Sequence, residues 1–274
     1  MNQATSKDTP LVDMEEFESW ILYEDDHILV INKPGWLVCH PSKNGPLSSL
    51  VGASKEYLGF DTLHLASRLD RETSGVVLLA KHRKSAGYWQ KGIEKKRICR
   101  SYLAIVEGKF PETQKISTFL GKDPSSVVYV KQRVTQESRK SKHATSIFSP
   151  IISNQGYTLC SVQTLTGRKH QIRIHAQWAG FPLVGEKLYG KDENIYLDFC
   201  TTGWRDEWLS LLGMHRQALH GRCLFDMDEK NKFLAPLPKD LTHFIHCQMG
   251  LNLDDINSLI NQSDEKFIHA MEEN

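Results

Sequence analysis

A short polar loop that runs directly into an apolar strand is the feature that most constrains this chain. The loop is Ser67–Gly75, SRLDRETSG, and the residues that follow it, Val76–Ala80, are all apolar. Asp70 lies in this loop between Arg68 and Arg71. Because nearby cations favour the charged form of a carboxylate, we expect Asp70 to be ionised. The structural alternative is a turn aspartate that caps the strand entry.

The composition is that of an ordinary globular protein. The chain has 274 residues, of which 40% are hydrophobic and 24% charged, enough for one large domain or two smaller ones. No apolar run is long enough to cross a bilayer, and the first eight residues lack the apolar core of a secretory signal. The six cysteines show no CxxC spacing. We therefore expect reduced thiols, a cytoplasmic location and no membrane partner.

The net charge of +1 is uninformative, but the distribution of charge is not. Residues 81–100 contain eight basic residues and one acid, and further basic groups lie in 133–143 and 168–175. Segregated charge gives a neutral protein a basic face, which favours a nucleic-acid partner. The alternative is a set of solvated helix faces.

Hydrophobic patterning predicts strands and helices that do not alternate strictly, which indicates an α+β fold. The expected strands are 21–23, 28–31, 76–80, 101–108, 144–148, 157–165 and 217–226, and the expected helices are 47–57, 85–96, 168–178 and 253–271. Residues 121–142 form either a hairpin or a mobile basic loop. Residues 190–214 give no clear pattern.

Three blocks, in this order, resemble the RluA-type pseudouridine synthases. Ser67–Gly75 is similar to that family's His-Arg-Leu-Asp-x-x-Thr-Ser-Gly motif, and Arg100–Gly108 is similar to its tyrosine motif. Thr166–His175 matches its Thr-Gly-Arg-x-His-Gln-Ile-Arg block. The resemblance extends over about residues 21–241.

The resemblance implies one α+β catalytic domain over residues 20–241. Its architecture would be a mixed, mostly antiparallel sheet with flanking helices and a central catalytic cleft. Residues 1–19 are expected to form a flexible N-terminal arm, and residues 242–274 a C-terminal helical extension. Two positions depart from the family pattern: Ser67 replaces the motif histidine, and Glu186 replaces the usual aspartate of a Gly-Asp pair.

The implied reaction detaches uracil from C1′ of a uridine in RNA, rotates the base and rejoins it through C5. It involves no redox change or hydrolysis, so we expect no cofactor and no metal. By resemblance, Asp70 acts as nucleophile at C1′ or as base at C2′. Tyr102 removes the C5 proton or stacks on the base. Arg173 pairs with Asp70 through its planar guanidinium.

A stacked uridine must be extruded before it reaches Asp70, at a cost of a few kcal/mol. The resemblance assigns to Arg68 the filling of the gap that is left. The other predicted substrate-binding residues are Arg71, Lys95, Lys96, Arg97, Arg168, His170 and Gln171. The predicted partner is structured RNA, either tRNA or rRNA, bound by a monomeric protein.

Three alternative functions compete with this interpretation. His243–Cys247, HFIHC, has histidines and a cysteine, but not at a recognised zinc spacing. A hydrolytic N-glycosidase would also use a carboxylate at C1′, and it would release free uracil. A catalytically inactive RNA-binding relative would be expected to have lost Asp70, Tyr102 or Arg173, all of which are present.

Overall fold

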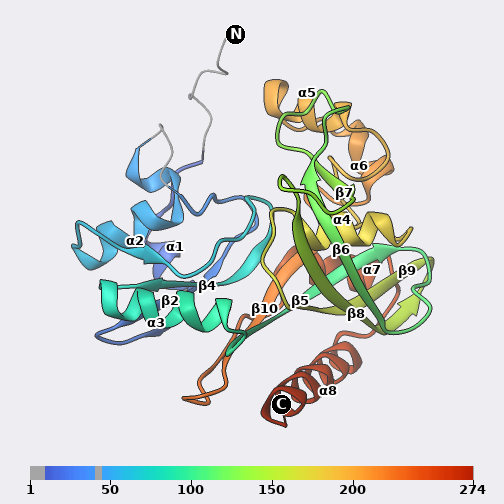
Figure 1. The fold of residues 1–274 in the computed structure, drawn as a ribbon. Coiled ribbons are helices and arrows are strands. Elements are labelled where there is room, and N and C mark those ends of the chain that lie inside the picture. The colour runs from blue at the N-terminus through green and yellow to red at the C-terminus, as the bar shows by residue number, and fades with distance from the viewer. Residues whose placement is uncertain (1–9, 41–44, 274) are drawn as a thin grey trace. The chain divides into compact units, whose positions relative to one another are not determined.

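The computed structural model describes residues 10–40 and 45–273 (Figure 1), and the chain divides into two compact units. The first unit contains residues 1–99 and 220–238, and the second contains residues 100–219 and 239–274. This differs from the predicted single catalytic domain over 20–241 followed by an extension. The final helices belong to the second unit, because they pack on its strands. The predicted central cleft stays a prediction.

The first unit is a small sheet with helices. Its strands are β1 (Ile21–Glu24), β2 (Ile28–Lys33), β3 (His64–Leu65), β4 (Ser74–Ala80), β10 (Leu219–Asp226) and β11 (Lys232–Leu234). Its helices are α1 (Met14–Glu18), the 3₁₀ turn η2 (Pro46–Ser48), α2 (Leu50–Leu58) and α3 (Arg83–Glu94). The pair of β4 and β10 is parallel, whereas β4 is antiparallel to β2 and β3. All seven residues of β4 are buried, as expected for a strand covered on both faces.

The predicted flexible arm over residues 1–19 is wrong in its described part. Residues 14–18 form α1, and Asp13 caps this helix by accepting a hydrogen bond from the Glu15 amide. Phe17 is completely buried, with its ring centre 5.8 Å from that of Trp20 and 5.5 Å from that of Tyr57. The burial of this aromatic side chain holds the segment on the unit. Residues 1–9 lie outside the described residues.

The second unit is built on five antiparallel strands. In sheet order these are β5 (Ile98–Glu107), β9 (Tyr157–Thr164), β8 (Lys142–Asn154), β6 (Gln114–Lys122) and β7 (Gln132–Thr135). The helices are α4 (Gln171–Trp178), α5 (Asn194–Thr202), α6 (Glu207–Leu212), α7 (Lys239–Cys247) and α8 (Leu253–Glu272). The pairing of β6 with β7 selects the hairpin for residues 121–142.

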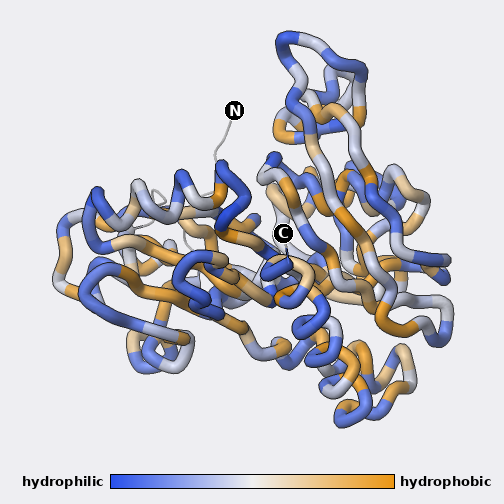
Figure 2. The backbone as a smooth tube through the Cα atoms, turned by 60° about the horizontal axis from the view of Figure 1, so that its bottom comes forward, coloured by the Kyte–Doolittle hydropathy of each residue, from blue (hydrophilic) through white to orange (hydrophobic). Residues whose placement is uncertain are grey.

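The unassigned segment 190–214 contains α5 and α6, which pack together around Ile195, Trp208 and Leu212. Hydrophobic and hydrophilic residues alternate along α8 (Figure 2), which is typical of a helix with one face on a core. The prediction of an α+β fold with mostly antiparallel strands is confirmed.

Candidate active site

The Asp70 loop enters β4 through a tight backbone turn. The amide of Thr73 donates to the carbonyl of Asp70 over 3.1 Å, and β4 begins at the next residue. Gly75 has a φ of +111°, and a Cβ at this position would lie 2.1 Å from the carbonyl oxygen of Gly221 on β10. Only glycine fits here, so the parallel pairing of β4 with β10 fixes where the loop ends.

Two buried polar side chains lock this end of the loop. Ser74 Oγ lies 2.9 Å from Nδ1 of His220, and Nε2 of His220 lies 3.3 Å from the carbonyl oxygen of Ala235. Ser74 and His220 are 1% and 0% exposed. Sequence reasoning missed His220, because no motif connects it to the loop 146 residues away.

Lys33 fastens the loop to the preceding segment. Its side chain is completely buried, and its Nζ donates to the carbonyls of Pro34 (2.8 Å), Leu37 (2.7 Å) and Arg71 (3.0 Å). Arg71 Nε donates in turn to the carbonyl of Trp36 at 3.1 Å. A buried ammonium is tolerated only when its donors are satisfied, so these bonds tie residues 33–37 to the loop. The sequence showed only a Lys-Pro-Gly break after β2.

The charged groups of the loop also act on residues 39 and 40. Cys39 Sγ donates to the carbonyl of Leu69 at 3.4 Å, and burial raises the pKa of this thiol. Burial lowers the pKa of His40, and the positive charge of Arg68 lowers it further. Arg68 and Arg71 are exposed and Asp70 is half-buried. The expected placement of the Asp70 carboxylate between these two cations stays a prediction.

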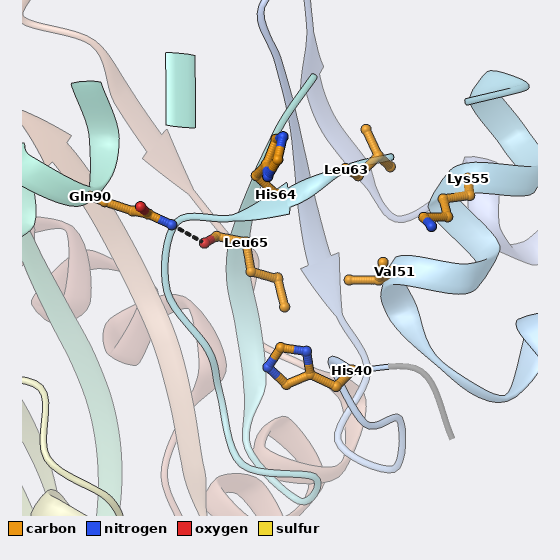
Figure 3. Close-up of a pocket in the computed structure, with 7 residues that line it drawn as sticks. All are labelled: His40, Val51, Lys55, Leu63, His64, Leu65 and Gln90. Atoms are coloured by element: carbon orange, nitrogen blue, oxygen red, sulfur yellow. Dashed lines mark hydrogen bonds between the residues drawn. The ribbon is translucent and has the colours of Figure 1, made fainter. Parts of the chain in front are cut away.

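A pocket of about 350 Å³ opens beside β3, which leads into this loop (Figure 3). Gln90 Nε2 donates to the carbonyl of Leu65 at its edge over 3.1 Å. The lining residues are His40, Val51, Lys55, Leu63, His64, Leu65 and Gln90. Asp70 is not among them, so this pocket lies beside the Asp70 loop and is not lined by its carboxylate.

Tyr102 lies on β5 opposite Val162 of β9 and is 9% exposed. Thr164, two residues further along β9, shares that face of the sheet with Tyr102, because side chains alternate along a strand. The hydroxyl of Thr164 is buried and has no hydrogen-bond partner within the described residues. A buried hydroxyl without a partner is rare in folded proteins, and here it lies on the same face of the sheet as Tyr102.

Arg173 is held by Glu186, which the sequence shows only as a departure from the family's Gly-Asp pair. Nε and Nη2 of this 5%-exposed arginine donate to Oε2 and Oε1 of Glu186 over 2.8 and 2.6 Å. Glu186 Oε1 also accepts from the amides of Leu188 and Tyr189. Burial raises the pKa of Glu186, but the Arg173 charge and these hydrogen bonds outweigh it and lower the pKa. The predicted pair of Arg173 with Asp70, which belongs to the first unit, stays a prediction.

Gln171 has a structural role in the fold, and its predicted contact with the substrate stays a prediction. Its Oε1 accepts from the Thr166 hydroxyl (2.7 Å) and the Arg168 amide (3.0 Å). Its Nε2 donates to the carbonyl of Thr145 and to Ser146 Oγ. These four bonds use both donors and both acceptor sites of the amide, so Gln171 orders the turn before α4.

The other predicted RNA contacts of the second unit have partners in the fold as well. Arg168 is exposed, and its Nε donates to the carbonyl of His143 over 2.8 Å. His170 adopts a left-handed backbone with φ of +54° at the start of α4, and its Nδ1 lies 2.8 Å from the hydroxyl of Tyr189. Both residues therefore support the segment that carries Arg173.

The basic residues at the end of α3 are of two kinds, exposed lysines and an arginine paired within the fold. Lys95 and Lys96 are exposed, as a phosphate contact requires. Arg97 instead pairs with Asp226 (3.3 Å) and Asp228 (3.1 Å), and its guanidinium lies 4.0 Å from the centre of the Tyr88 ring. The sequence grouped the three residues because it shows charge but not partners.

A family model described as RNA pseudouridylate synthase matches residues 27–178, which include Asp70, Tyr102 and Arg173. The chain belongs to this family. The RluA-type resemblance found in its motifs is thereby confirmed, and its enzyme class is that of an RNA pseudouridine synthase, which is an isomerase.

Similar proteins support this family assignment. The uncharacterized RNA pseudouridine synthase YjbO of Bacillus subtilis is 33% identical over 234 residues, covering 82% of this chain and 75% of the relative. The ribosomal large subunit pseudouridine synthase D of Neisseria meningitidis (strain Z2491) is 31% identical over 258 residues, covering 90% and 66%. The solved human RNA Pseudouridylate Synthase Domain Containing 4 superposes with a TM-score of 0.66 at 25% identity, covering 86% of this chain and 95% of that one.

The described residues offer neither a membrane-spanning helix nor a metal-binding cluster. None of the helices there has the length and apolar composition that a bilayer crossing needs. Histidine, cysteine and acidic side chains form no cluster of three that could hold a metal ion in residues 10–40 and 45–273.

Proposed function

We propose that this enzyme converts specific uridines of a structured RNA, tRNA or rRNA, to pseudouridine, with Asp70 acting at the ribose. The observation that carries the proposal is the way the Asp70 loop is fixed. Lys33 ties its backbone from one side, and the close approach of Gly75 to Gly221 fixes its end. A carboxylate on a loop held in this way is preorganised for one geometry, which is what reaction at a sugar carbon requires.

Two courses are open to the Asp70 carboxylate. As a nucleophile, it bonds to C1′ while the C1′–N1 bond breaks and uracil leaves with the electron pair. The rotated base then attacks C1′ through C5 and displaces the carboxylate. As a base, Asp70 removes the C2′ proton while N1 departs, and it returns that proton when C5 attacks C1′. Either course ends with loss of the C5 proton and gain of a proton at N1, so the product is an isomer of the substrate.

Tyr102 and Arg173 take the other two roles in this proposal. Tyr102 meets the base, either by accepting the C5 proton or by stacking. The Nε and Nη2 atoms of Arg173 bind Glu186, and the rest of its guanidinium orients the carboxylate of Asp70.

The test uses total RNA from cells that lack this gene, incubated with the purified full chain. Pseudouridine is counted by mass spectrometry of nucleosides, and free uracil is measured in the same reaction. We expect the pseudouridine content of the RNA to rise with no free uracil. Free uracil with no pseudouridine would mean an N-glycosidase. Tight RNA binding with neither product would mean an inactive RNA-binding relative.

A further inference from the structure

The loop between β6 and β7, residues 123–131, holds two apolar side chains out in solvent. Tyr129 is 80% exposed and Val127 is 71% exposed. Nζ of Lys122, at the end of β6, lies 3.9 Å from the centre of the Tyr129 ring. An aromatic ring displayed in this way, with a cation over it, needs an explanation in a chain that exposes few of its aromatic residues.

The loop is anchored, so the exposure of Tyr129 is not a consequence of a loose segment. Val128, between the two exposed residues, is 2% exposed and packs in the cluster of Leu188 and Tyr189. The amide of Asp123 donates to the carbonyl of Lys131 over 3.1 Å and closes the base of the loop. The burial of Val128 therefore turns its neighbours outward.

A second anchor comes from the segment that the sequence left unassigned. Glu193 Oε2, at the start of α5, accepts from Ser126 Oγ (2.8 Å) and from Lys131 Nζ (2.7 Å). Figure 1 shows the loop beside α5. One carboxylate thus binds both sides of the loop, and α5 acts as its support.

Basic residues are concentrated in the segment that contains Tyr129. The exposed cations of residues 122–142 are Lys122, Arg133, Arg139, Lys140 and Lys142, and Glu137 is the exposed acid of this segment. The loop acid Asp123 lies 3.7 Å from Arg133 and is thereby neutralised. A single exposed ring among cations suits the stacking of a nucleic-acid base near phosphates, whereas a stable protein interface has a broad apolar centre.

We propose that Tyr129 is a stacking platform for an unpaired base of the RNA substrate, with Lys122 beside it for the phosphate and Glu193 holding the loop in place. This inference rests on the proposed function, because it takes RNA as the partner. Stacking on an aromatic side chain is tolerant of sequence, so the platform would contribute to affinity for unpaired RNA more than to the choice of uridine.

The experiment measures dissociation constants of the full chain for decauridine and for a ten-base-pair RNA duplex. Tyr129→Ala should weaken decauridine binding by about 5- to 100-fold and change duplex binding by less than about twofold. Tyr129→Phe keeps the ring and should stay within about twofold of the parent. Trp178→Ala is the matched control, because Trp178 is also an exposed aromatic residue (62%) of the second unit but lies outside the loop.

A double-variant cycle tests the role of Glu193. Glu193→Gln should weaken decauridine binding, and adding it to Tyr129→Ala should cause little further loss, because Glu193 acts through the loop. Additive losses would contradict this positioning role.

Unchanged decauridine affinity of Tyr129→Ala would overturn the platform, and so would an equal loss for Trp178→Ala. A Tyr129-dependent change in oligomeric state without a change in RNA affinity would assign the ring to a protein contact instead. Pseudouridine formation by the parent protein, measured on the same preparation, separates failure of this inference from failure of the proposed function.

Discussion

Arg173 and Glu186 form a buried, two-point ion pair, with Nε–Oε2 and Nη2–Oε1 distances of 2.8 and 2.6 Å. Glu186 is 2% exposed, and the backbone amides of Leu188 and Tyr189 satisfy its Oε1 further. The pair fixes the plane of the guanidinium on α4, so the residue that replaces the family's usual aspartate decides how Arg173 is presented.

Glu186→Gln should lower the free energy of unfolding by about 3 kcal/mol, because it leaves the buried Arg173 charge unpaired. Glu186→Asp keeps the charge and should lose less. Urea denaturation of both variants measures the difference. If Glu186→Gln is as stable as the parent, the pair has no role in holding Arg173.

The acid stability of the second unit should depend on His175. This histidine is completely buried, with Nδ1 3.0 Å from Ser146 Oγ and Nε2 3.0 Å from Thr118 Oγ1. Burial, together with the smaller effect of the His143 charge, lowers its pKa from 6.5 to about 4. The folded-state pKa therefore lies below the unfolded one, so the unfolded chain takes up the proton first as the pH falls.

The stability that neutral His175 contributes is complete above pH 6.5 and is lost as the pH falls towards 4, by about 3 kcal/mol in total. Unfolding free energies of the parent and of His175→Gln between pH 4 and 7 measure this as a difference in slope. NMR titration of the His175 ring in the parent provides a check that needs no variant. A ring pKa near 6.5 would contradict the prediction.

The basic residues at the end of α3 should differ in role: Lys95 and Lys96 should contribute to RNA binding, and Arg97 to stability. Lys95→Ala with Lys96→Ala should weaken binding to all RNAs alike and reduce the salt slope by about one unit per lost phosphate contact. The free energy of unfolding of this double variant should stay within about 0.5 kcal/mol of the parent. Arg97→Ala should instead destabilise the fold, because Asp226 is completely buried beside it. If the salt slope is unchanged in the double variant, α3 does not contact RNA.

These residues show which features of the fold and the site can be predicted from the sequence. Its periodicity predicted β1, β2, β4, β5, β8, β9 and β10 but not β3, β6 or β11, and the order of its motifs predicted the family. The partners of Gln171, Arg97 and Arg173 depend on side chains that only tertiary packing brings near, such as Asp226 and Glu186. The sequence also missed α1 within the predicted N-terminal arm, because the burial of the Phe17 ring outweighs the polar composition of that segment.

Arg68 should matter most when the target uridine is stacked. It is exposed, and Arg71 supplies a second cation near Asp70. A residue that fills the gap of an extruded base offsets the cost of extrusion, which is small for an unstacked base. Arg68→Ala should therefore lose far more activity on a folded RNA than on a loosened analogue, and Arg68→Lys should recover little. Single-turnover rates on both RNAs measure this. Equal losses with recovery by lysine would mean that Arg68 supplies only charge.

The central claim is that the Asp70 carboxylate performs the reaction. The direct measurement is single-turnover pseudouridine formation by pure Asp70→Asn protein on an RNA that the parent modifies, with RNA affinity measured alongside. Asparagine keeps the shape of the side chain and removes its charge. We predict no detectable pseudouridine, with RNA affinity within about tenfold of the parent, because the carboxylate reacts while other groups bind. Measurable pseudouridine from the Asp70→Asn protein would contradict the account.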